Sequence, residues 1–400
     1  MKIPQIVLSE PYRIFFPLGF IMGLFGISYW VAVSTGLVQS YNPLYHGIIQ
    51  IELFSAAFAV GFLLTALPKF LQARPTTMRE LACLVAAYLV LGGAALLNNL
   101  VISQWSFVIL ISLLIRFAAI RVKERKAAPP FPFLLVAFGL LEGVLGALLL
   151  IYPWQLFPGL GQLLLEQGMF LSLSLGVGSF LGPRLMGVVD PANAAVTLPR
   201  RAADNLPLYK SPAAIVLAIG LTIFVSFFIE AALHREVGIY LRAAAAFLCL
   251  ARFNVIRIPR SRTVIGILAA VSLWCMPLGI LLAGMFPEHA SGMLHLLYIG
   301  GFGLLILTIG AQVISTHGGV HRFWEIYKNG AILIGVTVAA SVVVRMSATL
   351  FPQHYFLLLG TAAMLFDTAL ILWGAGVLRY ISSTISRAPW PVGAGHVARS

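Results

Sequence analysis

The sequence predicts an all-α membrane protein of about twelve transmembrane helices, and three observations lead to this fold class. First, 60% of the 400 residues are hydrophobic and 10% are charged, whereas a soluble domain carries about 25% charged residues. Second, apolar runs of about 20 residues, the length that spans a bilayer, follow one another along the chain. Third, the basic residues recur in every second connection between these runs. In lipid, such a chain satisfies its backbone polar groups only as helices or as a closed barrel, and these runs have helical length.

Twelve runs have the length and apolar character of a spanning helix, with ends defined to within a few residues. Their predicted bounds are 15–38, 46–67, 81–97, 100–120, 131–151, 162–181, 212–233, 238–254, 264–285, 292–315, 328–350 and 354–379. Between the third and fourth runs, Asn98 and Asn99 predict a tight turn. After the fifth run, Tyr152 and Trp154 are expected at the depth of the membrane interface.

The basic residues indicate how the chain is oriented. All but three of the 26 Lys and Arg residues lie at the two termini or in every second connection, and the exceptions are Arg235, Arg242 and Arg345. This positive-inside pattern predicts a multi-pass protein of the bacterial cytoplasmic (inner) membrane with both termini in the cytoplasm. Topology thus explains the net charge of +13, so the expected partner is the lipid bilayer and no nucleic acid is expected.

The longest connection predicts two six-helix halves. Residues 1–190 form the first half, 191–211 a central cytoplasmic loop, 212–381 the second half and 382–400 a flexible tail rich in small residues and Pro.

Local patterns give little support to other classes of protein. The N-terminus is interrupted by Pro4 and Pro11, and it lacks the apolar core and the cleavage site of a signal peptide. Cys83, Cys249 and Cys275 lie far apart within apolar runs, without metal or disulfide spacing, and are expected to be small buried hydrophobic side chains. No phosphate loop, dinucleotide-binding glycine motif or CxxC site indicates soluble enzyme chemistry.

Two histidines are candidate haem ligands. His46 opens the second run and His295 lies near the start of the tenth, so the topology puts both near the outer face at similar depth. If these helices are neighbours, the imidazoles can supply two axial haem ligands, or one ligand and an open position. The alternative is that each histidine is a polar anchor at the membrane interface.

A third histidine, His317, lies roughly 33 Å from His295 along the tenth helix, because 22 residues separate them at about 1.5 Å each. It cannot share a metal ion with His295. It is either part of a second site near the cytoplasm or a helix cap favoured by the negative end of the helix dipole.

Several ionisable residues fall within the predicted spans, where charge is costly and indicates function by default. They are Glu52, Glu142, Glu230, Arg345 and Asp367. One interpretation is structural ion pairing, with Arg345 bonded to Asp367 or Glu230. The other is proton relay or substrate contact. Glu52, about 9 Å below His46 along the helix, could orient a ligand, relay a proton or pair with a cation.

Glycines cluster in the sixth and tenth runs. Gly176, Gly178 and Gly182 lie in and just after the sixth, and Gly300, Gly301 and Gly303 lie in the tenth. Close helix packing is expected at such positions, and the alternative is a flat cofactor lying on the glycine face.

Three stretches carry a family resemblance. They are Tyr45-His46 followed by Phe58-Ala59-Val60-Gly61-Phe62-Leu63-Leu64-Thr65-Ala66, Met293-Leu294-His295 with Gly300 and Gly303, and Thr316-His317-Gly318-Gly319. Together with the opening Arg13-Ile14-Phe15-Phe16-Pro17, they resemble the NnrS family of bacterial membrane proteins. The resemblance implies a twelve-helix protein that contains haem and copper and is linked to nitric oxide and nitrosative stress. It carries over His46, His295 and His317 as candidate metal ligands.

The chain departs from the family pattern in two places. Ile48 and Ile49 stand where the family has a second histidine and the following acid, and Ala311-Gln312 replaces a Thr-Arg pair. The resemblance therefore carries no ligand to position 48, and it supports haem better than copper.

The expected function is that of an NnrS-type integral membrane haem protein in nitric-oxide or nitrosative-stress metabolism, with His46 and His295 as axial ligands. The alternative is a proton-coupled secondary transporter, because two six-helix halves, a long central loop and the buried acids Glu52, Glu142 and Asp367 fit alternating access. No broken helix or internal sequence repeat supports that alternative. A third hypothesis is that the protein is a scaffold or assembly factor without a cofactor.

Overall fold

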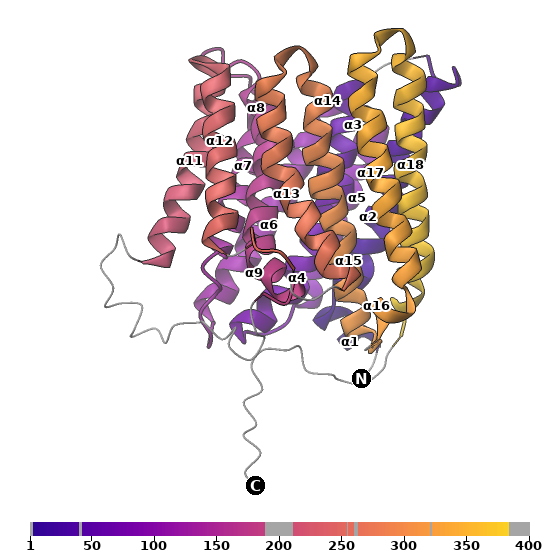
Figure 1. The fold of residues 1–400 in the computed structure, drawn as a ribbon. Helices are drawn as coiled ribbons and strands as arrows, with labels where there is room; N and C mark the ends of the chain where they lie inside the picture. The colour runs from indigo at the N-terminus through magenta and orange to yellow at the C-terminus, as the bar shows by residue number, and fades with distance from the viewer. Residues whose placement is uncertain are drawn as a thin grey trace.

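The computed structural model describes residues 3–39, 42–188, 211–253, 255–259, 263–320 and 322–383 (Figure 1). Within these ranges the chain forms a bundle of long helices and contains no strand, which confirms the predicted all-α fold class. The predicted central loop and tail lie almost entirely outside the described residues. The division into two six-helix halves stays a prediction.

Eleven of the described helical segments are long and apolar enough to cross a membrane. Eight of them are built on single helices: α2 (Tyr12–Ser34), α5 (Met78–Leu96), α6 (Leu100–Lys123), α7 (Phe133–Ile151), α11 (Pro212–Ala232), α13 (Val264–Met285), α17 (Lys328–Leu350) and α18 (Tyr355–Val377). The eighth predicted run is α12 (Arg235–Arg252), an 18-residue helix that carries four charged residues. It packs between α11 and α13, so the twelve predicted runs all correspond to helices.

The other three spans are composite, because each contains a π-helical segment. They are α3 (Pro43–Gly47), η1 (Ile48–Ser55) and α4 (Ala56–Leu71); α8 (Leu160–Leu163), η2 (Leu164–Gly168) and α9 (Met169–Leu185); and α14 (Ala290–His295), η5 (Leu296–Gly303) and α15 (Leu304–His317). The short helices are α1 (Ile3–Ser9), α16 (Phe323–Ile326), and the 3₁₀ turns η4 (Pro287–His289), η6 (Pro352–His354) and η7 (Leu378–Tyr380).

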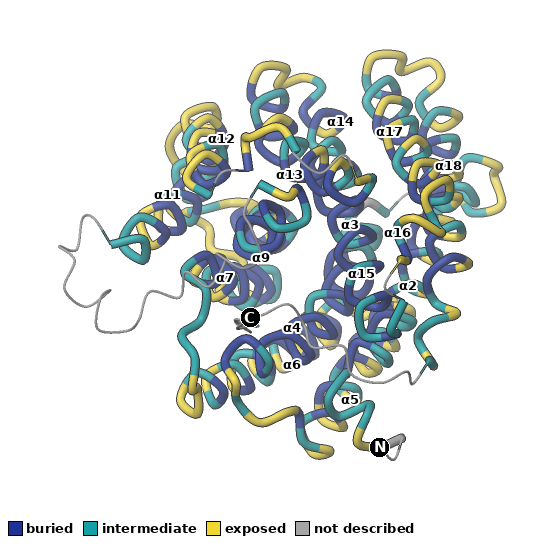
Figure 2. The backbone as a smooth tube through the Cα atoms, turned by 60° about the horizontal axis from the view of Figure 1, so that its bottom comes forward, coloured by how far each residue is buried: buried dark blue, intermediate teal, exposed yellow. Residues whose placement is uncertain are grey.

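The composite spans form the centre of the bundle. In their most apolar windows 83%, 78% and 78% of residues are buried, against 33–56% in the other eight spans. They are the second, sixth and tenth of the twelve predicted spans, so a central helix recurs at every fourth position. The remaining helices surround them and present their outer faces to the membrane (Figure 2).

The outer helices close into a ring around this centre. The hairpins α5–α6, α11–α12 and α17–α18 lie on the outside. α2 and α7 each pack against one composite span, and α13 packs against two, the tenth and the sixth. Each hairpin contacts the next of these three helices, and α18 closes the ring against α2. A group of four helices, one of them central, therefore repeats three times around the axis (Figure 2).

The π-helical turns need extra hydrogen-bond donors, because they interrupt the regular α-helical ladder inside the membrane. In η1 the Tyr88 hydroxyl donates to the Leu53 carbonyl at 3.0 Å, and the Ser55 hydroxyl donates to the Gln50 carbonyl at 2.7 Å. Side chains thus satisfy carbonyls that the wider turn displaces.

Local sequence signals account for the ends of several helices. Asn98 adopts a left-handed backbone conformation with φ of 53°, and the Asn99 side chain accepts a hydrogen bond from the Ile102 amide, which begins α6. The predicted Asn98–Asn99 turn is therefore confirmed. Asn tolerates the left-handed region better than most residues.

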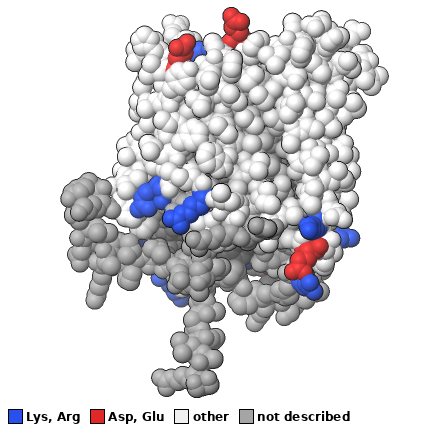
Figure 3. All heavy atoms as spheres, viewed as in Figure 1, with Lys and Arg blue, Asp and Glu red and all other residues white. Residues whose placement is uncertain are grey.

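Charge is distributed unevenly between the two ends of the bundle. On the face shown in Figure 3, Lys and Arg side chains gather mainly at the lower end, where α1 lies in Figure 1. The end of α18 lies at the same end as α1, so both ends of the described chain share one side. This arrangement agrees with the alternation read from the sequence. The orientation across the membrane stays a prediction.

The glycines of the central spans allow close helix contact, as predicted. A Cβ atom on Gly301 would lie 2.8 Å from Met276 of α13, and one on Gly176 would lie 2.9 Å from the Pro132 carbonyl before α7.

The cysteines follow the prediction only in part. Cys249 is buried and Cys275 is half-buried, but Cys83 is exposed on the outer face of α5.

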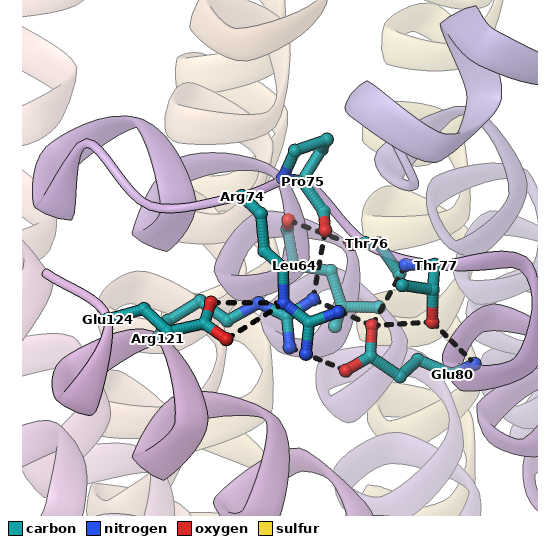
Figure 4. Close-up of polar contacts among 8 residues, drawn as sticks. All are labelled: Leu64, Arg74, Pro75, Thr76, Thr77, Glu80, Arg121 and Glu124. Atoms are coloured by element: carbon teal, nitrogen blue, oxygen red, sulfur yellow. Dashed lines mark hydrogen bonds and ion pairs between the residues drawn. The ribbon is translucent and has the colours of Figure 1, made fainter.

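An ion-pair cluster ties the α4–α5 connection to the end of α6 (Figure 4). Arg121 is fully buried and bonds both oxygens of Glu80 at 2.5 and 2.6 Å and the Pro75 carbonyl at 2.9 Å. Glu80 also accepts from the Thr77 amide and caps α5, so a single carboxylate fixes a helix start and holds a buried cation. Nearby, Arg74 and Glu124 form a more exposed pair.

We expect Arg121→Ala to destabilise the protein by about 3–5 kcal/mol, because the change leaves a largely buried carboxylate without its cation. Arg74→Ala removes the exposed pair and should cost no more than about 1 kcal/mol. Thermal unfolding of both variants in the same detergent measures the difference. Equal losses of stability in the two variants would show that the buried Arg121–Glu80 pair stabilises the protein no more than the exposed Arg74–Glu124 pair.

Candidate functional site

A cavity of about 640 Å³ lies between the three composite spans, at the end of the bundle opposite α1 (Figure 1). Its volume is within the range of about 300–1,000 Å³ that is usual for small-molecule and cofactor sites. Residues of η1, η2 and η5 all contribute to its wall. Because π-helical turns are rare and often occur at functional sites, their convergence marks this cavity as the candidate site.

His46 enters the cavity from α3. The Asn42 side chain accepts a hydrogen bond from the Tyr45 amide at 3.0 Å and so begins this short helix one turn before the histidine. The imidazole lies edge-on to Trp30, with ring centroids 5.1 Å apart, and its Nδ1 lies 3.4 Å from the Gly26 carbonyl. A carbonyl can only accept, so this contact puts the proton on Nδ1 and leaves the Nε2 lone pair for another partner.

His295 reaches the same cavity from α14. Its Nδ1 donates to the Ser291 carbonyl at 2.6 Å, which again leaves Nε2 as the acceptor nitrogen. The ring packs at right angles to Tyr298, one turn further on, with centroids 5.6 Å apart. His46 and Arg345 line the same cavity as His295. The structure therefore brings together the two histidines that the sequence singled out, and their role as metal ligands stays a prediction.

One wall of the cavity is polar and comes largely from the sixth and seventh spans. Glu166 accepts a hydrogen bond from the Gln162 side chain at 2.9 Å. It also lies close to α3, because a Cβ atom on Gly47 would stand 2.6 Å from its Oε1. A glycine beside His46 thus makes room for the Glu166 carboxylate.

The predicted partners of Arg345 are corrected by the structure. Glu230, which lines the cavity, pairs instead with Arg242 at 2.5 Å, and Asp367 accepts a hydrogen bond from Ser28 at 2.9 Å. Arg345 lies 3.5 Å from the Ser291 hydroxyl and lines the cavity beside His295. The sequence could not choose between these pairings because it does not show which helix faces touch.

Arg242 is buried behind the polar wall and connects three elements. Besides Glu230, it donates to the Gln167 side chain at 3.3 Å, and its guanidinium lies 4.1 Å from the centre of the Phe227 ring. These contacts account for one of the three Arg residues that depart from the positive-inside pattern. Its charge is satisfied within the bundle.

The cavity also has a set of apolar lining side chains. They are mainly aromatic and aliphatic side chains of the second, tenth and twelfth spans: Ile51, Phe54, Leu294, Ile299, Phe302, Leu359, Ala362, Ala363 and Phe366. The cavity lining is therefore amphipathic, because it combines histidines, acids and arginines with many apolar side chains.

Other predicted residues lie away from this cavity. Glu52 is fully buried on η1, where its Oε1 accepts from the Gln104 side chain at 2.7 Å. Glu142 is fully buried in α7, close to Gly168 of η2. Neither residue lines the cavity wall.

His317 lies at the other end of the tenth span, as predicted. Its Nδ1 donates to the Val313 carbonyl at 2.8 Å, and its Nε2 contacts the Lys69 amine. The ring also packs against Tyr12, with centroids 5.4 Å apart. An ammonium group beside Nε2 opposes the binding of a metal cation there.

Sequence reasoning missed several cavity residues. Glu166, Gln167 and Tyr298 lie within the predicted sixth and tenth runs, and Arg235 was noted only as an exception to the charge pattern. Glu166 carried the same signal as Glu52, an acid inside an apolar run, and should have been included. Tyr298 carried no signal, because a tyrosine near the end of a span is usually an interface anchor.

Comparison with known proteins identifies one family. The family model described as NnrS protein matches residues 6–384. No curated protein matches the chain.

We expect the cavity to be reached from the outer side of the membrane. In a background with all three cysteines replaced by Ala, Gln162→Cys places a thiol on an exposed cavity residue. A membrane-impermeant maleimide should label this thiol in bacterial cells whose outer membrane is permeabilised and whose inner membrane is intact. Lys126→Cys, in a connection predicted to be cytoplasmic, should react only after the inner membrane is broken. The reverse result would invert the predicted topology.

Proposed function

The chain belongs to the NnrS family, and on that premise we propose that it is a haem-binding protein of the bacterial inner membrane that acts on nitric oxide or related products of nitrosative stress. The single observation that carries the proposal is the meeting of His46 and His295 on one amphipathic cavity. Two central helices that are distant in sequence each supply one imidazole there.

The two histidines have the surroundings of metal ligands. Ligating histidines usually donate their second ring N–H to a carbonyl or carboxylate, which fixes the tautomer and the ring orientation. The Gly26 and Ser291 carbonyls take this role for His46 and His295. Both Nε2 atoms are then in the form that binds iron.

The rest of the cavity suits a large, flat and partly charged cofactor. Its volume of about 640 Å³ is adequate for one, and Phe54, Phe302 and Phe366 offer apolar surface to a macrocycle. Haem carries two carboxylate groups, and Arg345 and Arg235 on the cavity wall would neutralise them. When bound, haem would supply an iron centre able to take up a diatomic ligand or to pass an electron.

The polar residues of the cavity would bind the small-molecule ligand of the haem and would not hold the haem itself. Glu166, Gln167 and Tyr298 line the cavity and can exchange hydrogen bonds with a small polar molecule. Arg242 and Glu230 hold the polar wall in place, because their ion pair links two neighbouring helices.

The proposal does not extend to copper. Among the described residues there is no group of three or more His, Cys, Asp and Glu side chains placed to hold a metal ion. Both ring nitrogens of His317 already have partners, because Nδ1 donates to the Val313 carbonyl and Nε2 contacts the Lys69 amine.

The visible spectrum of the purified protein tests the proposal. We expect a haem Soret band that shifts on reduction. His46→Ala and His295→Ala should each lose the band or change it to that of a haem with one histidine ligand, because each removes one imidazole. His234→Ala is the matched control, since His234 is exposed at the start of α12 and does not line the cavity.

Folding of each variant is checked by its thermal unfolding and by its elution in detergent. A colourless wild-type protein that takes up no added haem would contradict the proposal. The buried acids Glu52 and Glu142 would then favour the transporter alternative. That alternative requires substrate-dependent proton flux in liposomes that Glu52→Gln abolishes.

A further inference from the structure

A second, apolar cavity of about 70 Å³ lies among the central helices. The residues that line it belong mainly to α4, α9 and α15, whose labels lie around the middle of the bundle in Figure 2. In all three helices these residues follow, in sequence, those that line the main cavity. The three spans run in the same direction, so the apolar cavity lies deeper in the membrane than the histidines.

Its wall is almost entirely hydrocarbon. Twelve of its fourteen lining residues are apolar, including Phe58, Phe62 and Leu305, and the exceptions are Ser55 and Ser174. The Ser55 hydroxyl already donates to the Gln50 carbonyl at 2.7 Å. A water molecule needs two to four polar partners to remain in a cavity, and this wall offers few.

Packed aromatic rings hold the cavity open. Phe58 stacks on Phe16 with centroids 4.7 Å apart and meets Trp373 edge-to-face at 5.5 Å. The Trp373 indole donates to the Leu307 carbonyl at 2.8 Å, which fixes its position. With the rings fixed on several sides, the wall cannot relax inward to fill the space.

The apolar cavity adjoins both neighbouring spaces. Ser55 lines it together with the main cavity, and Phe62 lines it together with a small pocket that contains Lys69 and His317. On the main-cavity side, Phe170 packs against Phe302 with centroids 6.0 Å apart, so aromatic rings form the partition. An apolar molecule that leaves the main cavity toward the membrane centre therefore meets this space first.

We propose that this cavity is a binding site for small, uncharged, apolar molecules, in the size range of a diatomic gas or a xenon atom. A dry apolar space of about 150 Å³ in an engineered protein binds xenon and benzene, and a water needs only about 10–15 Å³. At about 70 Å³ the present cavity exceeds the space of one water and is smaller than that engineered site. This size suits a small gas. The inference rests on the shape and chemistry of the wall and does not require haem.

Xenon is the probe for this site. The purified wild-type protein should show a saturable change in the ¹²⁹Xe chemical shift, above that of empty detergent micelles. Ala59→Phe and Val177→Phe add a ring from opposite sides of the cavity, on α4 and α9, and each should remove the saturable part. Ala86→Phe places the same ring on the exposed outer face of α5 and should leave it unchanged.

Two further results separate this inference from the proposed function. His46→Ala should retain xenon binding, because His46 does not line the apolar cavity. Both filling variants should unfold at temperatures close to that of the wild type, which excludes a general loss of structure. An absence of saturable binding in the folded wild type, or equal binding in a folded Ala59→Phe variant, would overturn the inference whatever the haem content.

Discussion

A polar group that leaves water for a bilayer must find its partner inside the protein, and this constraint shapes the whole molecule. The backbone meets it by forming helices throughout the described spans. Where η1 departs from the α-helical pattern, Tyr88 and Ser55 supply donors to its carbonyls. Arg242 meets Glu230 and Arg121 meets Glu80, so each of these two buried cations has its own carboxylate.

The same constraint concentrates chemistry at the centre. On the outer helices the buried charges of Arg121 and Arg242 are paired with carboxylates, whereas the polar residues of the main cavity lie where the three composite helices face one another. The π-helical segments of the second, sixth and tenth spans all contribute side chains to one shared cavity. Beneath that cavity the central helices become apolar, and aromatic packing leaves the smaller space beside Phe58. The bundle therefore changes in character along its axis, from polar at the histidines to hydrocarbon near the membrane centre.

The candidate site could be predicted from the sequence only in part. His46 and His295 were recognisable because the charge alternation puts both near the outer face, at the start of two helices that run in the same direction. Their cavity was not predictable, because helical periodicity does not say which helices are neighbours. Glu166 carried a signal that was overlooked. Arg242 was visible only as an exception to the charge rule. Its partner Glu230 was one of two candidates for Arg345, the other being Asp367, since either pairing puts opposite charges within the membrane.

The sequence by itself predicted the all-α membrane fold and twelve helical runs, and eleven described segments are long and apolar enough to cross a membrane. Those properties follow from local composition, run length and the positions of Lys and Arg, which any stretch of chain carries independently of the rest. Only the tertiary structure decided that every fourth span is central, that π-helical turns open one shared cavity, and that His317 belongs to a separate pocket beside Lys69. These depend on contacts between segments up to about 250 residues apart, since His46 and His295 line one cavity only after the ring of helices has closed.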